Sequence, residues 1–479
     1  MSQDLKVDLA VIGAGPGGYV AAIRAAQLGK SVALIEKHKL GGTCLNYGCI
    51  PSKDLLTTTE QYEKMKNAAA YGLSAEKVTF DWAKMQARKA KNVTILVKGV
   101  EFLCNGNKIS VLLGTATFRN ATHLEVALGT GEIQTVEARN VIIATGSRPI
   151  ALKGIPFDGQ AIIDSTAALD LPQVPQSLGV VGAGAIGLEI GTIYKRLGAE
   201  VVVVEMLDSI LPEVDPETAQ VAAQLLKKQG FVLHTGYVVK SAVRKEGQVE
   251  VVAVPREGQG DEKQFAVEKL LVAVGRRPDL EDLGLERLGV ALTPKGFIQV
   301  DERMETSVKE VYAVGDAVGG KLLAHKASRE GIVAAEAIAG RGTMMDYRAV
   351  PGSVFISPEV ASVGLKEEEA KAQGMTIKVG KFLFRANGRA LTLGESDGFV
   401  KIIADAETDQ ILGAHIIGPH ASDLLAEVTA AMEFEGTAED LASTIHIHPT
   451  LTEAVMEAAE AVHGQAVHMV NRLNQRHPY

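Results

Sequence analysis

The sequence is poor in cysteine and has no long apolar run. Only three cysteines occur among its 479 residues, Cys44, Cys49 and Cys104, which is too few for a disulfide-stapled secreted framework. No apolar stretch reaches the ~18 residues that a membrane-spanning helix needs. The first residues carry no basic segment ahead of an apolar run, so we expect no signal peptide. A reducing, cytoplasmic location is therefore expected.

An excess of basic charge is also absent. Lys and Arg number 49 against 58 Asp and Glu, for a net charge of −9, which argues against nucleic acid or an anionic membrane surface as the main partner. Hydrophobic residues make up 46% and charged residues 22% of the chain, which excludes a disordered or collagen-like protein. At roughly 150 residues per domain, the length predicts about three domains.

A glycine-rich pattern occurs twice, with an offset of 169 residues. Each copy reads as a strand, a glycine turn, a helix and a second strand that ends in a glutamate. The key residues are Gly13, Gly15, Gly18 and Glu36 in the first copy, and Gly182, Gly184, Gly187 and Glu205 in the second. The strand before, the helix after and the distant acid together predict two dinucleotide-binding units. The alternative is two plain strand–helix units whose glycines serve packing alone.

Each feature of the pattern has a physical reason. The first glycine permits a tight turn, the second lets the backbone approach a pyrophosphate, and the third lets helix and strand pack closely. Unpaired N–H groups at the helix start then meet the phosphate charge. A carboxylate at the end of the second strand can accept hydrogen bonds from an adenosine ribose. Because it would also repel a 2′-phosphate, Glu205 favours NAD over NADP.

The rest of the chain continues this organisation. A helix is expected over 81–103, with a basic face that we interpret as solvated and that consists of Lys84, Arg88, Lys89, Lys91 and Lys98. Three further strands end at Gly146, Gly275 and Gly315, at the edge where a doubly wound sheet binds its ligand. From about Asp346 the pattern predicts an α+β layer, with strands at 400–403 and 411–417 and helices at 422–434 and 453–463.

Two of the cysteines form a close pair. Cys44 and Cys49 lie five residues apart, directly after the first glycine unit and near a predicted helix start. A helix dipole and a nearby cation lower the pKa of a thiol and make such a pair reactive. A redox or metal-binding role is therefore favoured over a structural one, although a metal would need further ligands. Cys104 is expected to be a buried, small apolar residue.

Six motifs carry a resemblance to a known family. They are Gly41–Lys53, Thr145–Pro149, Gly275–Pro278, Gly315–Asp316, Leu322–Ala327 and His446–Glu453. The chain resembles the pyridine nucleotide-disulfide oxidoreductases, and among them most closely the dihydrolipoamide dehydrogenases, over essentially its whole length. It departs from their pattern at Tyr47, where valine is usual, and at Asp54, where alanine is frequent.

The resemblance implies two bound cofactors, one non-covalent FAD per subunit and NAD+/NADH. The implied FAD-binding residues are Gly13, Gly15, Gly18, Glu36, Lys53, Ala116, Gly146, Asp316, Leu322, Leu323, Ala324 and His325. The implied NAD-binding residues are Gly182, Gly184, Gly187, Glu205, Val239 and Gly275.

The resemblance also implies the catalytic roles. Cys49 would lie nearest the flavin and Cys44 would exchange with substrate, while Lys53 and Glu189 would form an ion pair beside the flavin. His448 would act as general base with Glu453 orienting its ring. Taken without the family, His446 and His448 share one face of an extended segment. This could indicate a metal site or a surface pair, but no third ligand accompanies them, so we expect no metal.

The implied fold class is α/β, with two Rossmann-like dinucleotide-binding domains and a C-terminal α+β dimerisation domain. The expected boundaries are 1–150 for the first part of the FAD domain, 151–275 for the NAD domain, 276–349 for the second part of the FAD domain and 350–479 for the interface domain. A homodimer is implied, in which the partner subunit supplies the base.

The implied reaction is ping-pong: dihydrolipoamide reduces the Cys44–Cys49 disulfide, and the electrons pass through FAD to NAD+. Because no lipoyl domain precedes Met1, we expect the lipoyl group on another chain. That chain would be the lipoyl domain and acyltransferase subunit of a 2-oxoacid dehydrogenase complex, or the lipoyl carrier of glycine cleavage.

Three alternatives share parts of these features. A glutathione reductase would need basic residues after the second repeat, where Glu205–Asp208 stands instead. A mercuric reductase would end in a cysteine pair, which the tail Asn474–Tyr479 lacks. A purely structural component of a multienzyme complex would not need the redox pair and the base.

Overall fold

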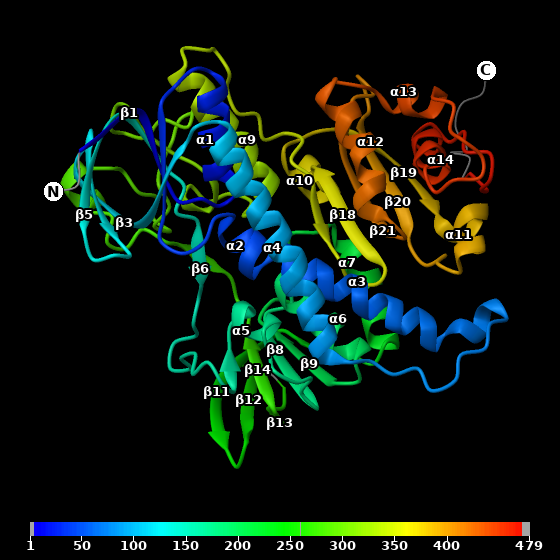
Figure 1. The fold of residues 1–479 in the computed structure, drawn as a ribbon. Coiled ribbons are helices and arrows are strands. Elements are labelled where there is room, and N and C mark those ends of the chain that lie inside the picture. Colours follow the sequence, from blue (N-terminus) through cyan, green and yellow to red (C-terminus); the bar gives the residue numbers. More distant parts are fainter. Residues whose placement is uncertain (1–3, 259, 472–479) are drawn as a thin grey trace. The chain divides into compact units, whose positions relative to one another are not determined.

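The computed structural model describes residues 4–258 and 260–471 (Figure 1). The chain divides into two compact units, each built from separate stretches of sequence. Unit 1 comprises Met1–Gly159, Ile163–Val174 and Val274–Asp346, and unit 2 comprises Gln160–Ile162, Pro175–Ala273 and Tyr347–Tyr479. Within the described residues, no helix is both long enough and apolar enough to cross a membrane.

A six-stranded sheet is the centre of unit 1. Its strands are β1 (Leu5–Ile12), β2 (Val32–Glu36), β3 (Ser110–Asn120), β4 (His123–Leu128), β5 (Ile133–Ile143) and β16 (Val311–Ala313). β1 pairs in parallel with β2 and β5, and β5 pairs in parallel with β16. All five residues of β2 are buried, as expected for a strand covered on both faces. A small two-stranded sheet joins β6 (Ser147–Pro149) to β15 (Arg276–Pro278).

Unit 1 also contains helices, of which α1 (Pro16–Gln27) packs directly on β1 and β2. The others are α2 (Gly42–Tyr47), α3 (Cys49–Lys66), α4 (Trp82–Gly106), α5 (Ser165–Leu169), α8 (Leu285–Leu288) and α9 (Ala324–Ile338). The contact between α1 and α9 depends on glycine, since a Cβ on Gly331 would lie 2.4 Å from the Gly17 carbonyl oxygen. The two backbones therefore approach at a distance that no other residue permits at this position.

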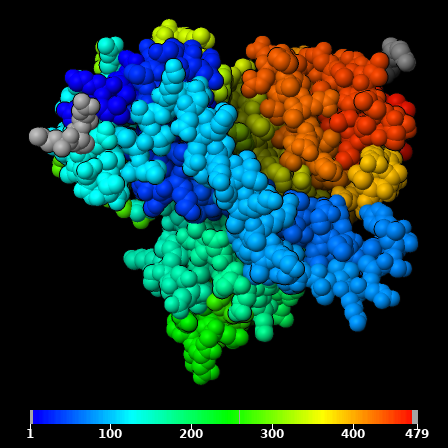
Figure 2. Space-filling view, in the orientation of Figure 1, coloured from blue at the N-terminus to red at the C-terminus, as the bar shows by residue number. Residues whose placement is uncertain are grey.

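The basic face expected on α4 is only partly solvated. The helix lies at the surface on the side shown in Figure 2, where it is coloured light blue. Lys89, however, is buried, and its Nζ donates to the Leu169 carbonyl oxygen at 2.7 Å and pairs with Asp170. The prediction that Lys89 is solvated was wrong, because helical periodicity does not reveal that the end of α5 offers acceptors to one lysine of that face.

Unit 2 contains a second sheet with the order β10-β9-β8-β14-β7, in which β10, β9, β8 and β14 pair in parallel. Its strands are β7 (Ile162–Ile163), β8 (Ser177–Val181), β9 (Glu200–Glu205), β10 (Val232–Thr235) and β14 (Lys269–Val272), and its helices are α6 (Ala185–Arg196) and α7 (Pro216–Lys228). An antiparallel sheet of β11 (Tyr237–Lys245), β12 (Gln248–Pro255) and β13 (Lys263–Val267) precedes β14. The strand–glycine–helix–strand repeat expected from the sequence is therefore present in both units.

The C-terminal part of unit 2 is an antiparallel sheet covered by helices. The sheet order is β17-β18-β21-β20-β19, with β17 (Gly352–Val354), β18 (Glu359–Gly364), β19 (Ile377–Leu383), β20 (Phe399–Asp405) and β21 (Ile411–Gly418). The helices are α10 (Glu367–Ala372), α11 (Gly388–Leu393), α12 (Ala421–Glu433), α13 (Ala438–Ser443) and α14 (Glu453–Val462). Apolar residues of β20, β21, α12 and α14 form one buried core. The α+β texture expected after about Asp346 is confirmed.

Candidate active site and dinucleotide sites

The first glycine loop has the geometry that its spacing predicts. Gly13 has a φ of +100°, and a Cβ there would lie 2.3 Å from the Ala144 carbonyl oxygen. A Cβ on Gly18 would lie 1.8 Å from the Gly13 carbonyl oxygen. At Gly15, by contrast, no described atom lies within 4 Å of the Cβ position. The loop is thus closed toward the sheet and open at Gly15, where a pyrophosphate can approach the start of α1.

The second glycine loop repeats this arrangement. Gly182 also has a φ of +100°, and a Cβ on Gly187 would lie 2.2 Å from the Gly182 carbonyl oxygen. The Cβ position of Gly184 is open among the described residues. Two loops of the same geometry at the starts of α1 and α6 fit two dinucleotides.

The two strand-end glutamates are held identically. Glu36 Oε2 accepts from the Ala14 amide at 2.7 Å and Oε1 accepts from the His38 amide at 2.8 Å. Glu205 Oε2 accepts from the Ala183 amide at 2.7 Å and Oε1 from the Leu207 amide at 2.9 Å. A carboxylate has about four lone-pair directions, so each can still accept ribose hydroxyls. These bonds join each glutamate to its own glycine loop and orient it before a ligand binds.

Unit 1 has further polar atoms that fit a flavin nucleotide. Thr145 Oγ1 is buried and lacks a hydrogen-bond partner among the described residues, an arrangement that a bound ligand would satisfy. Gly146 beside it has a φ of +74° with open space at its Cβ position. Ala116 is buried on β3, 3% exposed. The described residues of unit 1 therefore fit the expected FAD.

Asp316 belongs to a polar cluster that the sequence did not reveal. Ser147 Oγ donates to Asp316 Oδ2, and Arg276 Nε donates to Ser147 Oγ at 2.7 Å. Burial lowers the pKa of the Arg276 guanidinium, while the nearby charges of Asp316, Asp164 and Cys49 oppose that lowering. Ser147 lies in the motif Thr145–Pro149 and Arg276 in the motif Gly275–Pro278, but only the antiparallel pairing of β6 with β15 shows that the two residues meet.

A buried ion pair fixes the turn that carries Asp316. Lys326 Nζ donates to the carbonyl oxygens of Gly315 and Gly319, at 3.2 and 2.9 Å, and to Glu330 Oε2 at 3.1 Å. Glu330 Oε2 also accepts from the Gly315 amide at 2.7 Å. Both side chains are almost fully buried, with exposed fractions of 1% and 0%. Lys326 lies within the Leu322–Ala327 motif, but sequence spacing alone could not identify the Gly315 and Gly319 carbonyl oxygens as its acceptors.

The remaining expected cofactor residues lie in accessible positions. Leu322, Leu323 and Ala324 are half-buried before and at the start of α9, and His325 is exposed. Val239 is half-buried on β11. Gly275 is exposed, with a φ of +128° and its carbonyl oxygen accepting from the Ile150 amide at 3.1 Å.

The structure brings the two cysteines together. Cys44 lies in α2 and Cys49 is the first residue of α3, with Gly48 between the helices. A hydrogen bond with Cys49, burial and the charge of Cys49 raise the pKa of the Cys44 thiol, while Lys53 lowers it. The reduced pair therefore favours one thiolate over two. Cys104 is fully buried on α4, as predicted.

Lys53 and Glu189 belong to different units. Lys53 is half-buried on α3 of unit 1, four residues after Cys49. Glu189 is buried on α6 of unit 2, where its Oε1 accepts from the Phe355 amide at 3.0 Å. Their ion pair stays a prediction.

His448 and Glu453 form the expected dyad. His448 Nδ1 lies 2.8 Å from Glu453 Oε1, and the imidazole is 79% exposed. Burial alone would raise the pKa of Glu453, but the Thr450 amide and His448 outweigh it and hold that pKa below its usual value. With the Nδ1 proton donated to the carboxylate, Nε2 keeps a lone pair and can take a proton from a thiol.

His446 has a different environment. Its Nδ1 lies 2.8 Å from the Thr444 carbonyl oxygen and its Nε2 lies 2.7 Å from Glu427 Oε1. Only 5% of the side chain is exposed. Because both ring nitrogens contact protein oxygens, His446 has no ring nitrogen open to a substrate, which agrees with the choice of His448.

Among the described residues, no group of three or more His, Cys, Asp or Glu side chains is placed to hold a metal ion. The tail residues Asn474–Tyr479, on which the argument against a mercuric reductase rests, lie outside the described residues. The first three residues, which belong to the segment for which no signal peptide is expected, also lie outside the described residues.

Comparison with known proteins decides the family. Residues 7–331 match the model of the pyridine nucleotide-disulphide oxidoreductases, and residues 350–459 match the dimerisation domain of the same family. The chain belongs to this family.

Curated relatives match over nearly the whole length. A dihydrolipoyl dehydrogenase of Geobacillus stearothermophilus is 47% identical, with 98% of each chain covered. One of Thermus scotoductus is 49% identical, covering 97% of this chain and 99% of the relative. One of Halobacterium salinarum is 46% identical, with coverages of 97% and 98%.

Solved structures agree in fold. LpdA from Mycobacterium tuberculosis has a TM-score of 0.88 at 27% identity, covering 95% of this chain and 99% of that one. The HOCl-induced flavoprotein disulfide reductase RclA from Escherichia coli has a TM-score of 0.83 at 28% identity, with the same coverages.

These comparisons confirm several expectations. The family resemblance, the fold class and an oxidoreductase that uses FAD and NAD+/NADH are confirmed. The dimerisation domain supports the expected homodimer. The roles of individual site residues and the four domain boundaries stay predictions.

Proposed function

We propose that the chain oxidises protein-bound dihydrolipoyl groups and reduces NAD+, with Cys44 and Cys49 as the redox pair. The observation that carries the proposal is the hydrogen-bonded contact of these two thiols beside Lys53, in the unit that also holds the first glycine loop. The full-length similarity to curated dihydrolipoyl dehydrogenases supports the choice of substrate.

The thiol chemistry follows from the two cysteines and the dyad. In the oxidised enzyme, a dihydrolipoyl thiolate attacks Cys44 Sγ, the Cys44–Cys49 bond breaks, and Cys49 leaves as a thiolate. The second dihydrolipoyl thiol then attacks the substrate sulfur of the mixed disulfide, which releases the lipoyl disulfide and the reduced Cys44. His448 takes a thiol proton at Nε2, and Glu453 stabilises the resulting imidazolium.

The cofactors would be held by the residues described above. Bound FAD supplies the two-electron acceptor that passes the reducing equivalents of the dithiol to NAD+. The glycine loop at Gly13–Gly18 with Glu36, Thr145 and the Asp316 cluster would bind and orient the FAD. The loop at Gly182–Gly187 with Glu205 would bind the NAD+, with Val239 near the adenine and Gly275 near the nicotinamide end.

We extend the proposal to domains and partners. Residues 1–150 and 276–349 would form the FAD domain, 151–275 the NAD domain and 350–479 the interface domain. The base would come from the partner subunit of a homodimer, and the lipoyl group from an acyltransferase subunit of a 2-oxoacid dehydrogenase complex or from the glycine-cleavage carrier. The low cysteine content supports a cytoplasmic location.

Substitution of either cysteine tests the reaction. Cys44→Ser and Cys49→Ser proteins should each lose lipoamide-dependent NADH formation, because neither can form the disulfide that receives the electrons. Cys104→Ser is the matched control and should keep it, since Cys104 is buried on α4. The measurement is steady-state NADH production from free dihydrolipoamide and NAD+, with NADP+ and glutathione disulfide assayed in parallel. Full activity in either active-site variant would contradict the mechanism.

A further inference from the structure

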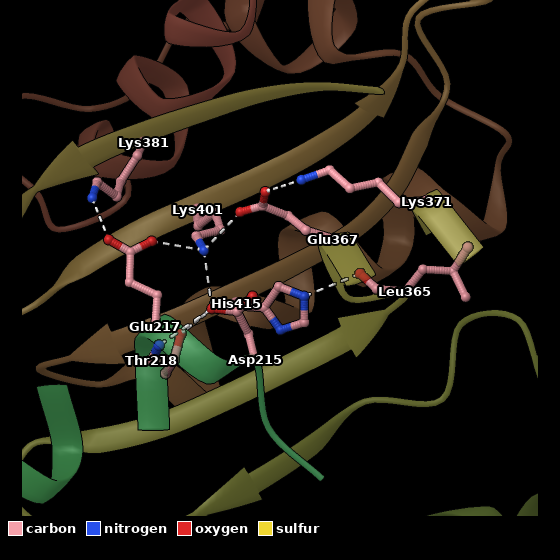
Figure 3. A network of polar contacts seen from close by, with 9 residues as sticks. All are labelled: Asp215, Glu217, Thr218, Leu365, Glu367, Lys371, Lys381, Lys401 and His415. Carbon is pink, nitrogen blue, oxygen red and sulfur yellow. Dashed lines mark hydrogen bonds and ion pairs between the residues drawn. The ribbon is translucent and has the colours of Figure 1, made fainter. Parts of the chain in front are cut away.

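Lys401 is a buried cation at the junction of the second dinucleotide fold and the C-terminal sheet, both within unit 2. It lies on β20, and its side chain is only 2% exposed. Figure 3 shows its ammonium group surrounded by three carboxylates. Lys401 Nζ lies 3.0 Å from Asp215 Oδ1, 2.7 Å from Glu217 Oε2 and 3.0 Å from Glu367 Oε1.

The three carboxylates come from two different helices. Asp215 is the N-cap of α7, where its side chain also accepts from the Thr218 amide at 3.2 Å, and Glu217 lies in the first turn of the same helix. Glu367 is the first residue of α10. An ammonium group has three N–H donors, so each acceptor can take one. The geometry therefore specifies where the start of α7 lies against β20 and α10.

Outer lysines complete the charge balance of the cluster. Lys381 Nζ lies 2.5 Å from Glu217 Oε1, and Lys371 Nζ lies 3.1 Å from Glu367 Oε2. Asp215 is as buried as Lys401, with 2% of its side chain exposed. Burial alone would lower the pKa of Lys401, but its bonds to the three carboxylates outweigh it and raise that pKa. Lys401 is thus charged across the physiological range, and its loss would leave Asp215 as an uncompensated buried anion.

The start of α7 is linked by hydrogen bonds to the NAD loop. Only nine residues separate Glu205, at the end of β9, from Asp215. Within this connection the Leu211 amide donates to the Ala183 carbonyl oxygen at 2.9 Å, and the Leu207 amide donates to Glu205 Oε1 at 2.9 Å. Ala183 lies between Gly182 and Gly184. A displacement of Asp215 would therefore be transmitted to the glycine loop and to Glu205.

We propose that Lys401 is a positioning residue for the NAD+ half of the reaction. By fixing the N-cap of α7 against the C-terminal sheet, its ammonium group holds the 205–215 connection, and through it the ribose and pyrophosphate binding positions. This inference rests on the proposed function, because the NAD+ half-reaction is part of that function. It does not involve Cys44, Cys49 or the His448–Glu453 dyad, so the thiol half of the reaction should not depend on Lys401.

A ping-pong reaction allows the two halves to be measured separately in the holoenzyme dimer. For Lys401→Met we expect the KM for NAD+ to rise by about 10- to 100-fold, the effect of a displacement of about 1 Å at a binding position. Flavin reduction by dihydrolipoamide, followed by stopped flow before NAD+ is added, should change by less than about 2-fold, since no group of that half is altered. Lys378→Met on the neighbouring β19, an exposed lysine, is the matched control and should match the wild type in both measurements.

Two further variants keep the proposal testable if Lys401→Met does not fold. Glu217→Gln and Glu367→Gln each remove one partly exposed partner and should give smaller increases in the NAD+ KM. In Lys401→Met/Asp215→Asn, removal of the uncompensated anion should recover part of the lost NAD+ affinity. An unchanged NAD+ KM in all of these variants, or an equal loss in both half-reactions, would overturn the proposal. Direct NADH binding, measured by fluorescence titration, separates this result from failure of the proposed function, since it needs no lipoyl substrate.

Discussion

At the residue scale, His446 and His448 differ in what the second nitrogen of each ring contacts. His446 and His448 are two residues apart and each meets a glutamate. His446 has a second acceptor at Nδ1, whereas His448 uses one nitrogen for Glu453 and exposes the rest of its ring. A base needs an open ring nitrogen, so the pairing supports the prediction that His448, rather than His446, is the base.

This pairing gives a prediction for Glu453. Glu453→Gln should lower kcat for dihydrolipoamide oxidation by about 10-fold, part of the roughly 10²- to 10⁴-fold that general base catalysis contributes. The reason is that the amide cannot stabilise the imidazolium as a carboxylate does. NADH oxidation by ferricyanide, which needs no thiol proton transfer, serves as the control reaction and should be unchanged. Equal losses in both assays would assign Glu453 to folding instead.

The pH dependence of the dyad follows with a definite sign. The pKa of Glu453 lies below the ordinary value of 4.5, so the folded state favours the ionised carboxylate. Its contribution is present above pH 4.5 and is lost as the pH falls through the lowered pKa. The geometry of the dyad should therefore persist through neutral pH, and in Glu453→Gln the acid limb of the stability profile should be shallower than in the wild type.

At the scale of elements, the sequence could predict what is local and repetitive. The glycine loops, their helices and the strand-end glutamates were all predicted, because tight turns and helix starts depend on neighbouring residues. The contacts of Lys89, Lys326, Arg276 and Lys401 were not. The bonds of Lys89, Arg276 and Lys401 join elements between 34 and 186 residues apart. Lys326 reaches carbonyl oxygens of a turn outside its own helix. No periodicity in the chain encodes which of these acceptors a lysine or arginine will meet.

The α1–α9 contact yields a prediction at this scale. Gly331→Ala would place a Cβ 2.4 Å from the Gly17 carbonyl oxygen, which must push α9 away from α1. We expect a loss of stability of about 1–3 kcal/mol, the usual cost of overpacking, together with weaker FAD retention because α1 begins at the first glycine loop. Gly99→Ala on α4, whose Cβ position is open among the described residues, is the matched control and should be neutral or slightly stabilising. Thermal unfolding followed by flavin fluorescence measures both; a Gly331→Ala protein as stable as Gly99→Ala would contradict the close-contact argument.

At the scale of the whole molecule, a single subunit leaves large apolar side chains exposed in the C-terminal region that carries the proposed base. Ile445 and Ile447 are 96% and 78% exposed, on either side of His446, and Phe434 at the end of α12 is 84% exposed. Large side chains of this kind are stabilised when a partner covers them. The match to the dimerisation domain supplies that partner as a second copy of the chain.

The dimer should therefore be a condition for activity. In an Ile445→Asp dimer, the new carboxylate would be buried at the interface with no counter-charge, which costs several kcal/mol. The substitution should therefore convert the protein to monomers. If the base acts across the interface, the monomer should also lose dihydrolipoamide oxidation while each subunit still binds NADH. Val243→Asp on β11, 59% exposed in the antiparallel sheet of β11, β12 and β13, should leave mass and activity unchanged. Sedimentation velocity and activity measured on the same samples decide the question, because an active Ile445→Asp monomer would show that one subunit holds a complete site.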